Sequence, residues 1–68
     1  MASDLVRIYS VDKLYQAELL RQMLDDHNIA SFIVNKQDSA YKFGDIELFV
    51  HRDDVIKAKM LIREFETT

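Results

Sequence analysis

The segment Asp45-Ile46-Glu47-Leu48-Phe49-Val50-His51 places an apolar residue at every second position. That is the period of a β-strand, so the sequence predicts a strand over 45–51. Because successive side chains of a strand point to opposite sides of a sheet, the strand has two different faces. One face carries Ile46, Leu48 and Val50, and the other carries Glu47, Phe49 and His51.

A helix is predicted after this strand, over residues 53–66. Its apolar residues recur at helical spacing, and the acidic pair Asp53 and Asp54 supplies a start that suits the helix dipole. The apolar stripe consists of Val55, Ala58, Leu61, Ile62 and Phe65.

Two segments precede the strand over 45–51. The nearer one, residues 35–44, is a polar loop that is longer than the usual hairpin connection of about 2–5 residues. Before it, residues 29–34 predict a second strand. The apolar residues of that strand fall on both faces, so we expect it to be well covered.

The N-terminal part of the chain has the same alternation of strand and helix. Residues 5–9 are rich in β-branched and aromatic side chains and predict a strand. Residues 12–27 predict an amphipathic helix, with Ser10 or Asp12 as its N-cap and Asn28 in the left-handed position that ends it. The apolar stripe of this helix consists of Leu14, Ala17, Leu20, Met23 and Leu24.

The order strand–helix–strand–strand–helix in 68 residues predicts a single α+β domain. The economical arrangement is a ferredoxin-like βαββα fold without the last strand of that fold. Its three-stranded antiparallel sheet has the order 1-3-2, and both helices lie on one face. The first strand is then an exposed edge, and no element of the chain covers the other face of the sheet.

This bare face is predicted to hold apolar and aromatic side chains. It carries Leu5, Arg7, Tyr9, Glu47, Phe49 and His51, together with Phe32 or Ile33. An apolar patch on a protein with such a small core usually contacts something. We therefore expect a homo-oligomer with a self-association surface formed by Leu5, Tyr9, Phe32 and Phe49. Ligand binding on this face and an ordinary half-exposed sheet are the alternatives.

The polar loop over 35–44 is the second candidate site. Long loops in compact domains tend to be either functional or disordered. Two lysines give this loop a local positive charge in an acidic protein, and its aromatic residues could hold a partner. The residues expected to bind a protein partner or a small anionic ligand are Lys36, Tyr41, Lys42 and Phe43. The alternative is a flexible connection whose aromatic side chains pack onto the domain.

The composition offers little for catalysis. The chain has no Cys and a single Gly, so it forms no disulfide, no thiolate metal site and no glycine-rich phosphate loop. His51 with Asp53 and Asp54 could suggest a metal site, but a histidine that ends a strand before a helix-capping aspartate is common without metal. We expect no catalytic residues, no metal and no cofactor, and predict that the protein is not an enzyme.

The charge and hydropathy exclude further classes of function. The net charge of −3, from 9 basic and 12 acidic residues, gives no general attraction to nucleic acid. Single-stranded RNA is a minor alternative, because RNA-recognition domains stack bases on aromatic side chains of a similar open sheet. No apolar run reaches the roughly 18–20 residues of a membrane span, and no signal peptide is evident, so we expect a cytoplasmic location.

Several segments of the chain resemble one bacterial family. They are the opening strand, Tyr15-Gln16-Ala17-Glu18, Asn28-Ile29-Ala30, Phe43-Gly44-Asp45-Ile46-Glu47-Leu48-Phe49-Val50 and the Asp53 or Asp54 start of the last helix. Together they are similar to the family named putative prokaryotic signal transducing protein, a domain of unknown function. The resemblance implies a ferredoxin-like fold related to the PII-type regulators, and a regulatory role in signal transduction.

These observations favour a small, non-catalytic regulatory or adaptor module. We expect it to associate with itself and to bind a protein or small ligand through the open sheet face and the 35–44 loop. A sensor of small molecules, such as amino acids or nucleotides, is the alternative function.

Overall fold

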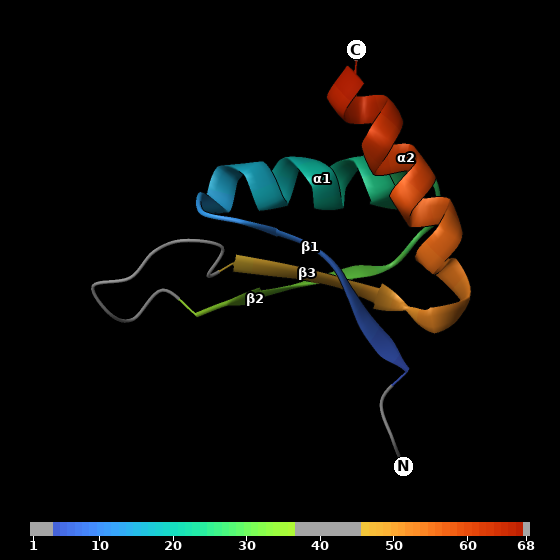
Figure 1. Ribbon diagram of the computed structural model, residues 1–68, viewed down its shortest axis with the longest axis horizontal. Helices are drawn as coiled ribbons and strands as arrows, with labels where there is room; N and C mark the ends of the chain where they lie inside the picture. Colours follow the sequence, from blue (N-terminus) through green and yellow to red (C-terminus); the bar gives the residue numbers. More distant parts are fainter. Residues whose placement is uncertain (1–3, 37–45, 68) are drawn as a thin grey trace.

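The computed structural model describes residues 4–36 and 46–67. The elements are β1 (Leu5–Val11), α1 (Leu14–Asp26), β2 (Ser31–Asn35), β3 (Ile46–His51), the 3-10 turn η1 (Arg52–Asp54) and α2 (Val55–Thr67). β3 lies between β1 and β2 and is antiparallel to both. Both helices lie on the same side of this sheet (Figure 1). The predicted α+β arrangement with strand order 1-3-2 is therefore confirmed.

The start of α1 differs from the prediction. β1 continues to Val11, because Ser10 and Val11 still pair with β3. Ser10 is thus a strand residue, and the prediction of Ser10 or Asp12 as the N-cap is wrong. The N-cap is Lys13, which has an extended backbone and makes no capping hydrogen bond through its side chain.

The end of α1 is closed as expected at Asn28, which has the left-handed φ of 63°. The backbone N–H of Asn28 donates to the Asp25 carbonyl at 3.0 Å, and that of Ile29 donates to the Leu24 carbonyl at 2.9 Å. This pair of bonds is a Schellman motif, and the buried side chains of Leu24 and Ile29 supply its usual hydrophobic contact. Because Ile29 belongs to this closure, β2 begins at Ser31 and not at residue 29.

A β-bulge in β1 changes the predicted faces of the sheet. Arg7 pairs with Phe49 and Tyr9 pairs with Leu48, so Ile8 is an extra residue. Directly paired residues share a face, and Tyr9 therefore lies with Leu48 on the helix side. Both Ile8 and Tyr9 pack against the core. The prediction that Tyr9 lies on the open face is wrong, since strict alternation does not hold across the bulge.

The core lies between β3 and the two helices. It consists of Leu20, Leu24, Ile29, Leu48, Val50, Ala58 and Ile62. Leu14 and Phe65, predicted in the apolar stripes, are exposed. In Figure 1 the last turns of α2 rise away from the sheet. Neither helix, over the residues that the structure describes, has the length and apolar character needed to cross a membrane.

Candidate functional site: the open sheet face

The open sheet face is the side of the sheet turned away from both helices. The register brings Phe32 and Arg7 against Phe49 from the two edge strands, and it sets Val34 against Glu47. We define this face by Leu5, Arg7, Phe32, Val34, Glu47, Phe49 and His51. It is the face opposite to the buried Ile46, Leu48 and Val50.

Aromatic and aliphatic side chains are exposed on the open sheet face. The rings of Phe32 and His51 meet edge to face, with centroids 5.6 Å apart and planes at 89°. Phe32 is 41% exposed, Val34 40% and Leu5 38%, whereas Phe49 between the edge strands is half-buried. Apolar side chains from three strands therefore form one surface that is open to water.

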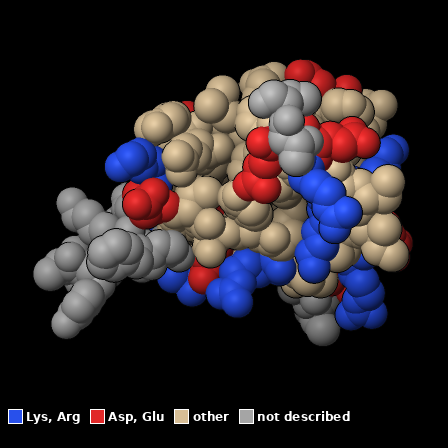
Figure 2. Space-filling view, turned by 45° about the horizontal axis from the view of Figure 1, so that its top comes forward, with Lys and Arg blue, Asp and Glu red and all other residues tan. Residues whose placement is uncertain are grey.

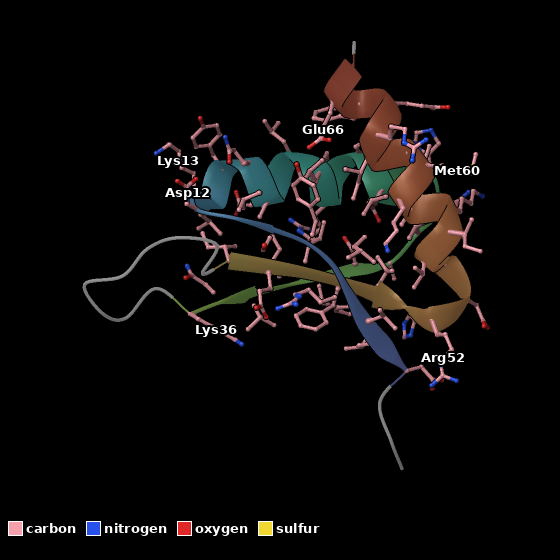
Figure 3. The ribbon with its side chains drawn as sticks, viewed as in Figure 1. Asp12, Lys13, Lys36, Arg52, Met60 and Glu66 are labelled. Carbon is pink, nitrogen blue, oxygen red and sulfur yellow. The ribbon has the colours of Figure 1, made fainter. Side chains whose placement is uncertain are left out.

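The same face carries an ion-pair network centred on Glu47, which is paired with Val34 in the sheet. The Arg7 guanidinium donates from Nη1 to Glu47 Oε2 at 3.0 Å. The Lys36 Nζ lies 3.3 Å from the second oxygen, Oε1. Arg7 is on β1 and Lys36 directly follows β2, so the carboxylate on the central strand links both edges of the sheet. In Figure 3 Lys36 projects from the end of β2 on the side away from the helices.

The network keeps Glu47 in its charged form. The hydrogen bond from Arg7 is the main cause that lowers the pKa of the Glu47 carboxyl below its usual value, and Lys36 acts in the same direction. Burial of the carboxyl acts in the opposite direction and raises its pKa, but the net effect is a lowered pKa. A carboxylate that already has two cationic partners offers no unsatisfied charge to an approaching apolar surface.

The structure brings together only some of the predicted site residues. Leu5, Phe32 and Phe49 lie on the open sheet face, and Lys36 joins it through Glu47. Tyr9 lies on the helix side of the sheet, because the β-bulge at Ile8 shifts the alternation of side chains in β1. Tyr41, Lys42 and Phe43 lie outside the described residues.

Sequence reasoning missed the ion-pair network and Val34. Glu47 was expected on this face, but its partners depend on the register, which a single sequence does not give. One signal was present: an acidic residue in the middle of an apolar strand, with a basic residue in or beside each of the other two predicted strands. Val34 was missed because the strand over 29–34 has apolar residues on both faces.

The described residues bring no group of three or more His, Cys, Asp and Glu side chains into position for a metal ion. His51 and Asp53 line a hollow of about 280 Å³ together with Asp4 and Arg52. Arg52 donates its backbone N–H to the Asp4 carbonyl at 2.7 Å, and its guanidinium lies 3.8 Å from the Asp4 carboxylate. These contacts hold the start of β1 against the end of β3. They explain why the residues that line this hollow lie close together.

Comparison with known proteins identifies a family. No curated protein and no solved structure gives a significant match to the chain. The family model described as putative prokaryotic signal transducing protein matches residues 5–66, which include every strand and nearly all of α2. The match thus covers the open sheet face and the helices behind it. The chain belongs to this family of putative prokaryotic signal transducing proteins.

Proposed function

We propose that this protein is a small, non-catalytic regulatory module whose open sheet face associates with a second copy of the chain. The observation that carries the proposal is the exposure of Leu5, Phe32 and Val34 together on one side of the sheet, beside a charge network that is already paired. The family supports a role in signal transduction, and the exposed surface supports binding as the means.

The size of the chain favours association. A domain of about 60 residues buries only about 60% of the surface that its unfolded chain exposes, and is correspondingly marginal in stability. Covering the open sheet face with a second copy would remove apolar surface from water at about 25 cal/mol per Å². The same face would then act as a second core, shared by two chains.

The charges of the open sheet face suit self-association. A two-fold contact places the same patch against itself, so the patch must complement its own charges. The cations Arg7 and Lys36 flank the anion Glu47, and both signs are therefore present on each copy. The same pairing weighs against the RNA alternative, because Glu47 occupies the cations that would contact phosphates.

A second partner would act by competition with the second copy. Lys36 contacts Glu47 on the open sheet face, so a protein or small anionic ligand that engages Lys36 would also contact the association surface. Binding of such a partner to one of the two states shifts the equilibrium toward that state. The change between separate and associated chains would then be the regulatory output.

The test compares two variants that each place a glutamate at an exposed apolar position. Phe32→Glu lies on the open sheet face, and Ile56→Glu, at a residue 76% exposed on α2, is the matched control. Sedimentation velocity over a range of concentrations should show the native chain and Ile56→Glu associating, and Phe32→Glu remaining monomeric. A native chain that stays monomeric at millimolar concentration, or equal behaviour of the two variants, would contradict the proposal.

A further inference from the structure

A groove of about 310 Å³ lies on the helix side of the sheet, between the end of β1, the first half of α1 and the last turns of α2. It forms because α2 rises away from the sheet and does not close onto α1 there (Figure 1). We call it the aromatic groove, and its walls include Tyr9, Tyr15, Gln16, Leu19, Phe65 and Glu66. Its volume is at the lower end of the roughly 300–1,000 Å³ of small-molecule sites.

Three aromatic rings line the aromatic groove, and each comes from a different element. Tyr9 belongs to β1, Tyr15 to α1 and Phe65 to α2. Tyr15 and Phe65 are exposed, so their rings are accessible to a small molecule. The face of an aromatic ring carries partial negative charge and attracts a cation.

Among the described residues, the lining of the aromatic groove contains one acidic side chain, Glu66, and no basic one. Lys59 and Arg63 line a neighbouring hollow that shares Tyr9 and Glu66 with the groove. Glu66 lies in the last turn of α2, where the helix dipole is also negative. Figure 3 shows Glu66 on the side of α2 that faces α1, and Met60 on the other side of the same helix. In Figure 2 much of the surface is uncharged, and both acidic and basic side chains lie beside its uncharged parts.

We infer that the aromatic groove binds a small organic cation of the alkylammonium class. The apolar groups of such a cation would pack against Leu19 and the rings, while its positive charge would be attracted by the rings and by Glu66. An anionic ligand would meet the carboxylate and the negative end of the helix dipole. The inference does not depend on the proposed self-association, because the groove and the open sheet face lie on opposite sides of the sheet.

The test uses choline and its uncharged carbon analogue, 3,3-dimethylbutan-1-ol, as probes of the native chain. Two-dimensional NMR titration should show saturable shifts of the backbone amides of Leu19 and Phe65 with choline. A cation–aromatic attraction of about 0.5–1 kcal/mol at an exposed site predicts that choline binds about two- to fivefold more tightly than the analogue. Equal binding of the two probes, or shifts confined to other parts of the chain, would overturn the inference.

Two pairs of variants separate the contributions of the Glu66 charge and the Tyr15 ring from general effects of a substitution. Glu66→Gln should weaken choline binding without affecting the analogue, whereas Glu64→Gln removes a charge that lines a different hollow, and should leave binding unchanged. Tyr15→Ala should weaken binding of both probes. Its control is Met60→Ala, since both residues are 59% exposed and Met60 lies outside the groove.

The same variants test whether a second copy of the chain, and not a small cation, occupies the aromatic groove. In that case apparent choline affinity would fall as the protein concentration rises, and Tyr15→Ala would reduce association. Reduced association of Tyr15→Ala, together with no choline-induced shift at Leu19 and Phe65, would overturn the inference of a cation site. Retained amide spectra of each variant establish that the fold is intact, which is expected because Tyr15, Met60, Glu64 and Glu66 are all exposed.

Discussion

Glu47 is an acidic side chain held in the centre of the sheet by two cations from its two sides. The carboxylate is covered, but the side chains of Arg7 and Lys36 are each 60% exposed, so water screens both ion pairs and each contributes modestly to stability. The Glu47 carboxylate accepts from Arg7 and lies next to Lys36, so it fixes both edges relative to β3. Its contribution depends on its being ionised, and this makes it sensitive to pH.

The lowered pKa of Glu47 predicts that acid destabilises the fold through this residue. The carboxyl has an ordinary pKa of 4.5 and a lower one in the folded state. A lowered folded pKa contributes stability above the ordinary value, and this contribution is lost as pH falls through the folded pKa. Urea unfolding of the native chain should therefore show stability decreasing as pH falls below about 4.5, and Glu47→Gln should show a shallower decrease.

Glu18→Gln is the control for the loss of one carboxylate, because Glu18 is exposed on α1 and away from the open sheet face. It should follow the native chain more closely than Glu47→Gln does. The same acid slope in the native chain and in Glu47→Gln would show that the ion-pair network has no part in stability.

At the scale of the elements, the Schellman closure of α1 depends on a single residue in the left-handed conformation. Asn28 is exposed and has a φ of 63°, so its role is in the backbone and not in packing. Asn28→Ala should lower the free energy of unfolding by about 1–2 kcal/mol, because a Cβ without a local hydrogen-bonding group is disfavoured there. Asn28→Gly should lose little, since glycine adopts this conformation readily.

Chemical denaturation of both variants measures this difference. If Asn28→Ala is as stable as Asn28→Gly, the left-handed position does not control the end of α1. The comparison tests the closure itself, because both substitutions remove the same amide side chain.

The elements were predictable from the sequence where side-chain periodicity is complete. The alternation of Ile46, Leu48 and Val50 predicts the central strand, and the spacing of Leu20, Leu24, Ala58 and Ile62 predicts the buried sides of the helices. The bulge at Ile8 was not predictable, because it is a property of the pairing between two strands. The start of α1 was misplaced because Lys13 forms the N-cap without a side-chain hydrogen bond, which leaves no signal in the sequence.

At the scale of the whole molecule, the strand order follows from the order of elements and the general rules of connection. The candidate site was predictable in part from the sequence. The sequence predicts an open face and places Leu5, Phe32 and Phe49 on it. The contacts of Glu47 and the aromatic groove were not predictable. The first requires the register of three strands, and the second requires the direction in which α2 leaves the sheet.

Self-association of the folded chain predicts a melting temperature that rises with protein concentration. Anything that binds the folded state and not the unfolded state stabilises the fold by mass action. For a domain of this size, each kcal/mol gained at the midpoint raises the melting temperature by about 4–8 °C. Differential scanning calorimetry should show this rise for the native chain and for Ile56→Glu, and its loss for Phe32→Glu. A melting temperature independent of concentration in the native chain would argue against association.

The bulge in β1 has a consequence for variation in chain length. Ile8 has no paired residue on β3, whereas Arg7 pairs with Phe49 and Tyr9 pairs with the adjacent Leu48. A chain that lacks residue 8 would have a plain strand in which Arg7 still points away from the helices and Tyr9 still points toward them. A natural relative with one residue fewer at this place would therefore keep the direction of both faces, but it would lose the packing of Ile8 against the core.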